Sequence, residues 1–209
     1  MSAEIIACLE RSDPVMRRLI RRVGPYGLRP DRRRSPFQSL VQAVANQQLN
    51  GKAAATILAR FVALFPGKRF PGPEDLAGVG DDALRGCGFS RAKVMAIRDL
   101  AEKALAGVVP DGRRIARWTD EEIVERLTQV RGVGRWTVEM LLIFQLGRRD
   151  VLPADDFGVR NGFRLAYGRA EMPRPRELLE HGERWRPHRS AAAWYLWRAT
   201  ELEWPGSGG

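Results

Sequence analysis

Side chains that build metal centres and disulfide scaffolds are scarce in this sequence. Its 209 residues contain two cysteines, Cys8 and Cys87, and two histidines, His181 and His188. Two thiols are too few for a disulfide framework or for the four ligands of an iron–sulfur cluster. Neither histidine has a neighbour at metal-ligand spacing, and such histidines are most often surface or capping residues. We therefore expect a reduced intracellular protein without an iron–sulfur cluster.

Long apolar runs and strand-like alternation are missing as well. No run of about 18 apolar residues occurs, so no membrane-spanning helix is predicted. The N-terminus lacks the basic and apolar regions of a secretory signal. Apolar residues instead recur at helical spacing along the chain. These patterns predict an all-α protein that does not associate with a membrane.

Positive charge, in contrast, is in excess. Lysine and arginine total 35 against 25 aspartates and glutamates, and the net charge is +10. Nearly all of these cations are arginine, the side chain that best forks onto phosphate. Nine arginines and two aspartates lie between Arg11 and Arg34, a local charge of +7. The excess of positive charge predicts a polyanionic partner. The alternative is that arginine is enriched throughout the proteins of the source organism, which would give the same charge without such a partner. Whether the Arg11 to Arg34 run contacts that partner or is a solvated face stays open.

Capping and stop signals divide the chain into helices. Asp13-Pro14 is expected to begin a helix that Gly24-Pro25 ends, and Ser35-Pro36 precedes the next. We predict helices over residues 14–23, 37–49, 52–65, 81–85, 91–106, 120–129, 136–146, 157–167, 173–183 and 187–203, with a linker at 108–118. Two helical lobes are predicted, one from residues 1–35 with 150–205 and one from 36–149, followed by a disordered tail at 206–209.

A glycine-rich turn joins two of these helices and predicts a helix-hairpin-helix over about residues 120–147. Gly132 and Gly134 lack side chains, so the backbone can approach a partner closely. Amides of the turn and of the next helix form a site for an anion such as phosphate. We expect Gly132, Gly134, Arg135 and Thr137 to contact it. An ordinary turn between packed helices is the alternative.

Two acids and an aromatic residue are the candidates for chemistry. Asp155 and Asp156 follow Leu152-Pro153 and precede a predicted helix, so one of them is expected to be its N-cap. The N-terminal end of a helix favours a carboxylate anion, which is suited to stabilising a developing cation rather than to donating a proton. Trp136, with Met140 one turn later on the same face, either stacks on a base or belongs to the core.

Uncharged amides gather at another helix junction, at Asn46, Gln47, Gln48 and Asn50. Such side chains hydrogen-bond base edges or occupy the place of a displaced base. They equally serve as caps of the flanking helices. Both interpretations remain open on the sequence.

Five segments together resemble a known family. They are FQSLVQAVANQQL (37–49), CGFSRAKV (87–94), VRGVGRWT (130–137), VLPADDF (151–157) and ERWRPHRS (183–190), the last running on to Trp197. The sequence resembles the helix-hairpin-helix DNA glycosylases, and among them the 3-methyladenine DNA glycosylase II branch. The resemblance implies an all-α fold with two helical lobes flanking a DNA-binding cleft.

The same resemblance implies roles for individual residues. Asp156 is the catalytic carboxylate, and Asp155 is then a cap. The base pocket contains Trp136, Met140 and Trp197. Met140 stands where a relative has tyrosine, and His188 replaces an aromatic residue. The residue that fills the gap left by the extruded base is Gln48, with Gln47 and Leu49 as alternatives. The lysine nucleophile of the bifunctional branches is absent, which implies a glycosylase without lyase activity.

The activity implied is excision of alkylated bases of the 3-methyladenine or 7-methylguanine type from damaged double-stranded DNA by hydrolysis of the N-glycosidic bond. We expect a monomer, located in the cytoplasm at the nucleoid or in a eukaryotic nucleus. No cofactor is expected. Na⁺ or K⁺ at hairpin carbonyls near Val130 and Val133 is the one metal allowed for. The alternatives are a non-catalytic helix-hairpin-helix DNA-binding protein and a glycosylase for deaminated or mismatched bases.

Overall fold

The structure is a computed structural model that describes residues 2–49 and 51–204, and all regular elements in these ranges are helical. The described chain divides into two compact units, Asp31–Leu141 and Met1–Pro30 with Leu142–Gly209. Each unit is described separately. The predicted boundaries, 35/36 and 149/150, lie five and eight residues C-terminal to the observed ones. Asn50 and the tail predicted at 206–209 are outside the described residues.

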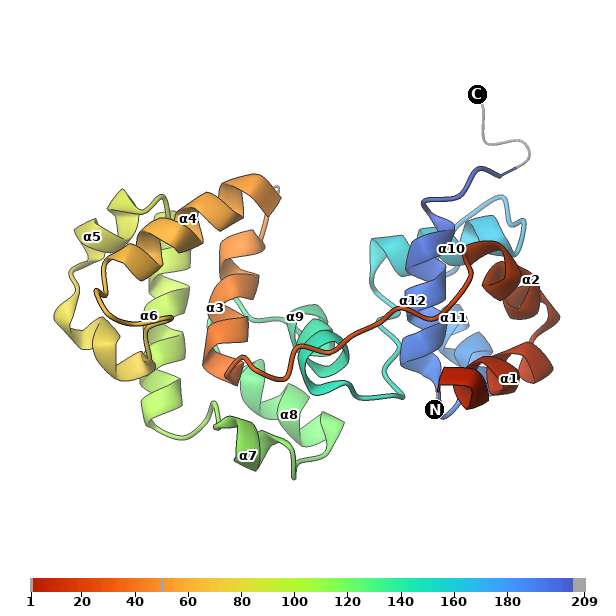
Figure 1. The fold of residues 1–209 in the computed structure, drawn as a ribbon, viewed down its shortest axis with the longest axis horizontal. Coiled ribbons are helices and arrows are strands. Elements are labelled where there is room, and N and C mark those ends of the chain that lie inside the picture. Colours follow the sequence, from red (N-terminus) through yellow and green to blue (C-terminus); the bar gives the residue numbers. More distant parts are fainter. Residues whose placement is uncertain (1, 50, 205–209) are drawn as a thin grey trace. The chain divides into compact units, whose positions relative to one another are not determined.

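The unit Asp31–Leu141 is built on α3 and α6, which pack against each other (Figure 1). Its elements are α3 (Pro36–Asn46), α4 (Gly51–Ala63), η1 (Pro73–Gly78), α5 (Asp81–Gly86), α6 (Arg91–Leu105), α7 (Gly112–Ile115), α8 (Asp120–Leu127) and α9 (Arg135–Leu141). Ser35 and Ser90 cap α3 and α6 with their hydroxyls. Apolar residues at helical spacing fill the core between the two, among them Leu40, Val41, Val44, Ile97 and Leu100.

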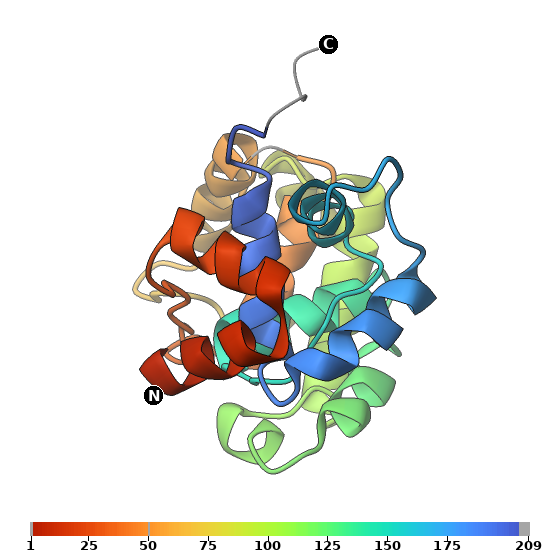
Figure 2. The ribbon, with the colours of Figure 1, turned by 90° about the vertical axis from the view of Figure 1, so that its right-hand side faces the viewer.

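The other unit combines both ends of the chain. Its elements are α1 (Ser2–Ser12), α2 (Pro14–Val23), the π-helical turn η2 (Leu142–Leu146), α10 (Phe157–Ala166), α11 (Pro175–Gly182), η3 (Glu183–Trp185) and α12 (Arg189–Ala199). α12 packs on α10 and on α2. Figure 2 shows α12, in dark blue, behind the two N-terminal helices, in red. Large buried side chains fill this core, including Met16, Leu19, Trp185, Tyr195 and Leu196.

The all-α prediction is confirmed, and most predicted helices are present with ends that differ by a few residues. Asp13 caps α2 and Gly24 ends it, as expected. Two predicted helix ends were wrong. α3 ends at Asn46 rather than at residue 49, because Gln48 adopts a left-handed φ of 58°. The helix after the hairpin is α-helical only to Leu141. Helices α1 and α7 were not predicted.

The histidines agree with expectation only in part. His188 is buried at the N-cap position of α12, where its side chain makes no capping hydrogen bond. His181 is mostly buried and lies 3.1 Å from both Asp13 Oδ2 and the Tyr167 hydroxyl, so it is not a surface residue. Among the residues that the structure describes, no helix is both long and apolar enough to cross a bilayer.

Candidate functional site

The hairpin between α8 and α9 has a tight, internally bonded backbone. The Val133 amide donates to the Val130 carbonyl at 3.0 Å. Gly132 has a φ of 75°, and a Cβ there would lie 3.4 Å from Ala96 Cβ. Glycine is therefore favoured by the left-handed conformation, while an added Cβ would make only an ordinary contact with α6. The predicted helix-hairpin-helix is confirmed.

Asp99 of α6 binds the backbone of the hairpin. Its carboxylate accepts a hydrogen bond from the Arg131 amide at 2.7 Å and another from Lys103 Nζ at 2.5 Å. Burial raises the pKa of Asp99, but these two donors outweigh it and hold the pKa below the ordinary value. The hairpin is thus tied to α6 by an ionised side chain.

The predicted phosphate ligands fall into two groups. Gly132, Gly134 and Arg135 are exposed, and Arg135 Nη1 lies 3.8 Å from Glu139 Oε1. Thr137 is only 5% exposed, so its side chain offers a ligand almost no surface. Val130 uses its carbonyl inside the turn, and a cation at this carbonyl and that of Val133 stays a prediction. Among the described residues, no group of three or more His, Cys, Asp or Glu side chains is placed to hold a metal ion.

Trp136 and Met140 lie one turn apart on α9. Trp136 is 47% exposed, which excludes the alternative that it is a core residue. Met140 is half-buried. A large aromatic surface this exposed is available for stacking.

Asp156 is the N-cap of α10. Its Oδ1 accepts one hydrogen bond from the Val159 amide and one from Trp197 Nε1, each 2.8 Å long. Asp155 is exposed and does not cap the helix, so the expectation that Asp155 is the cap was wrong. One carboxylate, Asp156, both starts α10 and binds the indole of α12.

Two glycines of α10 bring Trp197 to this carboxylate. A Cβ at Gly162 would lie 1.9 Å from the Leu196 carbonyl oxygen, so only glycine lets α12 approach so closely. A Cβ at Gly158 would lie 2.9 Å from Trp197 Cδ1 and 3.1 Å from Asp156 Oδ1. The contact between Trp197 and Asp156 therefore depends on the absence of two side chains.

Phe144 is a neighbour of Trp197 that the sequence did not reveal. Its ring centroid lies 5.4 Å from that of Trp197, with the planes tilted by 32°, and the side chain is 41% exposed. The π-helical turn that places Phe144 has no signal in the sequence pattern. The carboxylate thus lies beside a pair of aromatic rings within one unit.

The segment that leads to Asp156 is fixed to the start of α12. Ser190 Oγ donates to the Arg148 carbonyl at 2.8 Å and accepts from the Val151 amide at 3.0 Å. Arg189 binds both carboxylate oxygens of Asp150, with Nε to Oδ1 at 2.8 Å and Nη2 to Oδ2 at 3.1 Å. Bidentate pairs of this kind hold geometry well. The polar residues of the 183–190 segment therefore position the chain before Asp156.

The three candidates for filling the gap in the base stack differ in their surroundings. Gln48 and Leu49 are exposed, Leu49 by 40%. Gln47 is partly buried, and its Nε2 donates to the Gly132 carbonyl at 2.8 Å. Lys93 Nζ donates to the carbonyls of Ala45 and Gln47, each at 2.9 Å. Lys93 was not singled out from the sequence.

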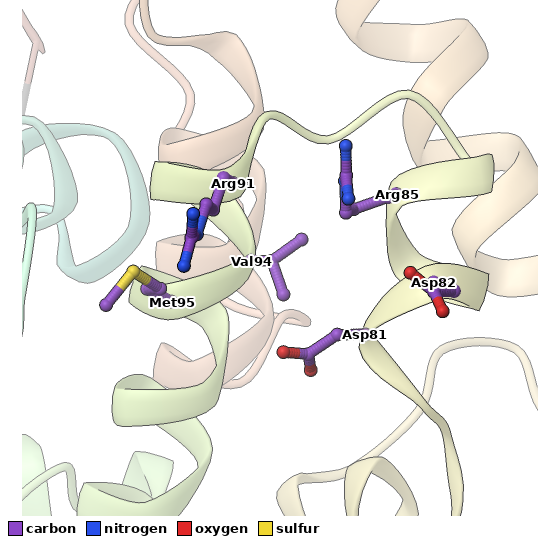
Figure 3. A pocket seen from close by; sticks show the side chains of 6 residues that line it. All are labelled: Asp81, Asp82, Arg85, Arg91, Val94 and Met95. Atoms are coloured by element: carbon purple, nitrogen blue, oxygen red, sulfur yellow. The ribbon is translucent and has the colours of Figure 1, made fainter.

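A pocket of about 480 Å³ lies between α5 and α6, and its lining includes none of the site residues described above (Figure 3). It is lined by Asp81, Asp82, Arg85, Arg91, Val94 and Met95. None of the residues predicted to receive a base lines it. Asp81 also accepts a hydrogen bond from Arg98 Nε at 2.9 Å.

An all-helical chain with a glycine hairpin, an exposed tryptophan after it, and a helix-capping carboxylate beside a second tryptophan defines a class of helix-hairpin-helix DNA repair protein. Residues 41–187 match the HhH-GPD superfamily of base excision DNA repair proteins. The chain belongs to this superfamily.

Individual relatives agree with this assignment. The chain is 43% identical over 193 residues to DNA-3-methyladenine glycosylase 1 of Schizosaccharomyces pombe, covering 91% of this chain and 84% of that one. A structure of the 3-methyladenine DNA glycosylase of that organism in complex with abasic DNA superposes with a TM-score of 0.85, at 42% identity, over 95% of this chain and 97% of the other. A DNA-3-methyladenine glycosidase of Bacillus halodurans gives a TM-score of 0.84 at 35% identity, over 93% and 88% of the two chains.

Proposed function

We propose that this protein is a monofunctional DNA glycosylase that extrudes alkylated bases from double-stranded DNA and releases them by hydrolysing the N-glycosidic bond. Bases of the 3-methyladenine and 7-methylguanine type are its substrates. The protein acts as a monomer on this proposal, because one chain supplies both the hairpin and the carboxylate. The names of its relatives support the substrate class.

The observation that carries the proposal is the position of Asp156. The carboxylate lies at the N-terminus of α10, where the helix dipole favours negative charge, and beside the Trp197 ring. As the glycosidic bond breaks, positive charge develops on the deoxyribose. A fixed anion near that charge stabilises the transition state more than the ground state.

The alkylated base itself makes a general acid unnecessary. A nucleotide methylated at N3 of adenine or N7 of guanine carries a positive charge on the base. The electron pair of the broken bond passes to the base, which leaves as a neutral molecule. Water then adds to C1′ of the sugar cation and gives its proton to solvent. Asp156 exchanges no proton in this step, and Trp197 and Phe144 offer ring surfaces to the cationic base before the bond breaks.

Extrusion precedes this step. Backbone amides and Arg135 at the hairpin grip a phosphate. The turn that follows α3, from its last residue Asn46 to Leu49 and called the 46–49 loop, then enters the base stack as the damaged nucleotide leaves it. Unstacking costs a few kcal/mol and costs least for a weakened pair. Trp136 and Met140 of α9 stay base-pocket residues that the resemblance predicts.

The test is Asp156→Asn in single-turnover release of 3-methyladenine from a defined duplex. Asparagine still caps the helix and still accepts from Trp197, so the variant removes the charge with little change in stability. We expect release to fall by about 100- to 1,000-fold, the scale of losing one electrostatic contribution to a transition state, with DNA affinity retained.

Asp155→Asn is the matched control, because Asp155 is the neighbouring acid and does not cap α10. It should keep most of the wild-type rate. A wild-type rate in Asp156→Asn would remove Asp156 from the chemistry. If the wild-type protein released uracil but no methylated base, its substrates would be deaminated rather than alkylated bases.

A further inference from the structure

Lys93 occupies an unusual place for a lysine. It lies in the first turn of α6, where its positive charge gains nothing from its own helix dipole. Its side chain instead reaches the C-terminal end of α3, where Nζ donates to the Ala45 and Gln47 carbonyls at 2.9 Å each. The last carbonyls of a helix lack partners within the helix. Lys93 thus supplies a charged cap to another helix, and burial lowers its pKa.

One of these two bonds acts on the backbone of the exposed loop. The Gln47 carbonyl belongs to the peptide unit that joins Gln47 to Gln48, so its direction sets ψ of Gln47 and φ of Gln48. Gln47 has ψ 127° and Gln48 has φ 58°. A left-handed φ is unfavourable for a residue with a side chain and persists only where surrounding contacts enforce it. The Lys93 ammonium is such a contact.

A second hydrogen bond joins the same loop to the hairpin. Gln47 Nε2 donates to the Gly132 carbonyl at 2.8 Å, across 85 positions of the sequence. Gly132 is itself held in a left-handed conformation against α6. The backbone of Gln47 is therefore fixed by Lys93 and its side chain by the hairpin, while Gln48 and Leu49 are exposed beyond it.

We propose that Lys93 is a positioning residue for base extrusion: with Gln47 it locks the 46–49 loop in the conformation that presents Gln48 and Leu49 to the base stack. The proposal rests on the proposed function in that it assumes an extruded base. On this proposal the Gln47 side chain links the loop to the hairpin by its hydrogen bond to Gly132, and it does not enter the base stack.

The first test compares Lys93→Met with wild type on two duplexes, one with 7-methylguanine opposite cytosine and one with 7-methylguanine opposite thymine. Methionine keeps the apolar stem of the side chain and removes the donor. A positioning role predicts a loss of about tenfold on the stable pair, the effect of one hydrogen bond to a charged group, and a much smaller loss opposite thymine, where extrusion is easier. A loss of folded protein lowers both rates equally, so an unchanged ratio overturns the proposal.

The second test needs no base release. A duplex with an abasic site and 2-aminopurine next to it reports entry of the loop into the stack as a rise in fluorescence. We expect wild type and the control Lys68→Met, which removes an exposed lysine paired with Asp75, to give the same rise. Lys93→Met should bind the duplex and give a smaller rise. Equal signals from Lys93→Met and wild type would overturn the proposal, even if the proposed glycosylase activity holds.

A double-mutant cycle separates positioning from structure. In a Gln48→Ala, Leu49→Ala background the loop has no large side chain to present. Lys93→Met should then change neither the ratio of the two release rates nor the fluorescence. The same tenfold loss in this background would show that Lys93 acts elsewhere and would contradict the proposal.

Discussion

At the scale of single residues, one carboxylate combines two tasks that usually fall to different side chains. Asp156 starts α10 by accepting from Val159, and the same oxygen accepts from the Trp197 indole. The first bond fixes the carboxylate at the positive end of a helix dipole. The second fixes it against the aromatic pair of Trp197 and Phe144. The orientation of the Asp156 carboxylate is therefore fixed before any ligand binds.

Trp197→Phe tests the second bond. Phenylalanine keeps an aromatic ring at this place but has no N–H to donate. We expect single-turnover base release to fall by about tenfold, because one hydrogen bond to a charged group is lost, while DNA affinity stays nearly unchanged. Trp194→Phe is the control, since Trp194 packs edge-on against Tyr26 at 5.3 Å and is not part of the site. Equal rates for both variants would mean that the indole N–H does not orient Asp156.

At the scale of elements, the packing of α10 on α12 decides whether the site exists. The two helices touch backbone to backbone at Gly162 and Leu196. Such contact leaves no space for a methyl group, and backbone cannot move aside as a flexible side chain does.

Gly162→Ala should therefore destabilise the protein by about 3 kcal/mol or more, in spite of the higher helix propensity of alanine. Urea unfolding followed by circular dichroism measures the change. Gly86→Ala in α5 is the matched control, because a Cβ at Gly86 meets nothing within 4 Å. That substitution should be neutral or slightly stabilising. Equal stability of the two variants would refute the close contact between α10 and α12.

The same elements show what the sequence can predict. Helix starts were found where a side chain signals them locally, at Asp13-Pro14 and Ser35-Pro36. α1 has no such signal and was missed. The roles of Gly158 and Gly162 were not predictable, because nothing local separates a helix contact from a flexible position. The hydrogen bond from Trp197 to Asp156 spans 41 positions of the sequence, and the one from Gln47 to Gly132 spans 85. Only the fold brings such distant residues together.

At the scale of the whole molecule, one buried acid links the two ends of the chain inside the core of the unit Met1–Pro30 with Leu142–Gly209. Asp13 caps α2 and is 1% exposed. Its Oδ2 accepts from Tyr167 at 2.5 Å and from Trp185 at 3.1 Å, and it lies 3.1 Å from His181 Nε2. Burial raises the pKa of Asp13, but the hydrogen bonds outweigh it and hold the pKa well below the ordinary value.

A lowered pKa in the folded state has a definite consequence for stability. Above the unfolded pKa of about 4 the ionised Asp13 contributes fully, and the contribution is lost as pH falls from there through the folded pKa. Asp13→Asn should thus lower the unfolding free energy by about 3 kcal/mol at pH 7, and the difference from wild type should shrink between pH 4 and pH 2. Urea titrations at several pH values measure this.

Hydrogen exchange locates the effect of the same substitution. Because Asp13 joins α2 to Tyr167, His181 and Trp185, amides of α2, α10 and α11 should lose protection in Asp13→Asn. Amides of α3 and α6 have their own core in the other unit and should keep theirs. A difference in stability from wild type that stays constant down to pH 2, or an equal loss of protection in both units, would show that the Asp13 cluster does not join the two ends of the chain.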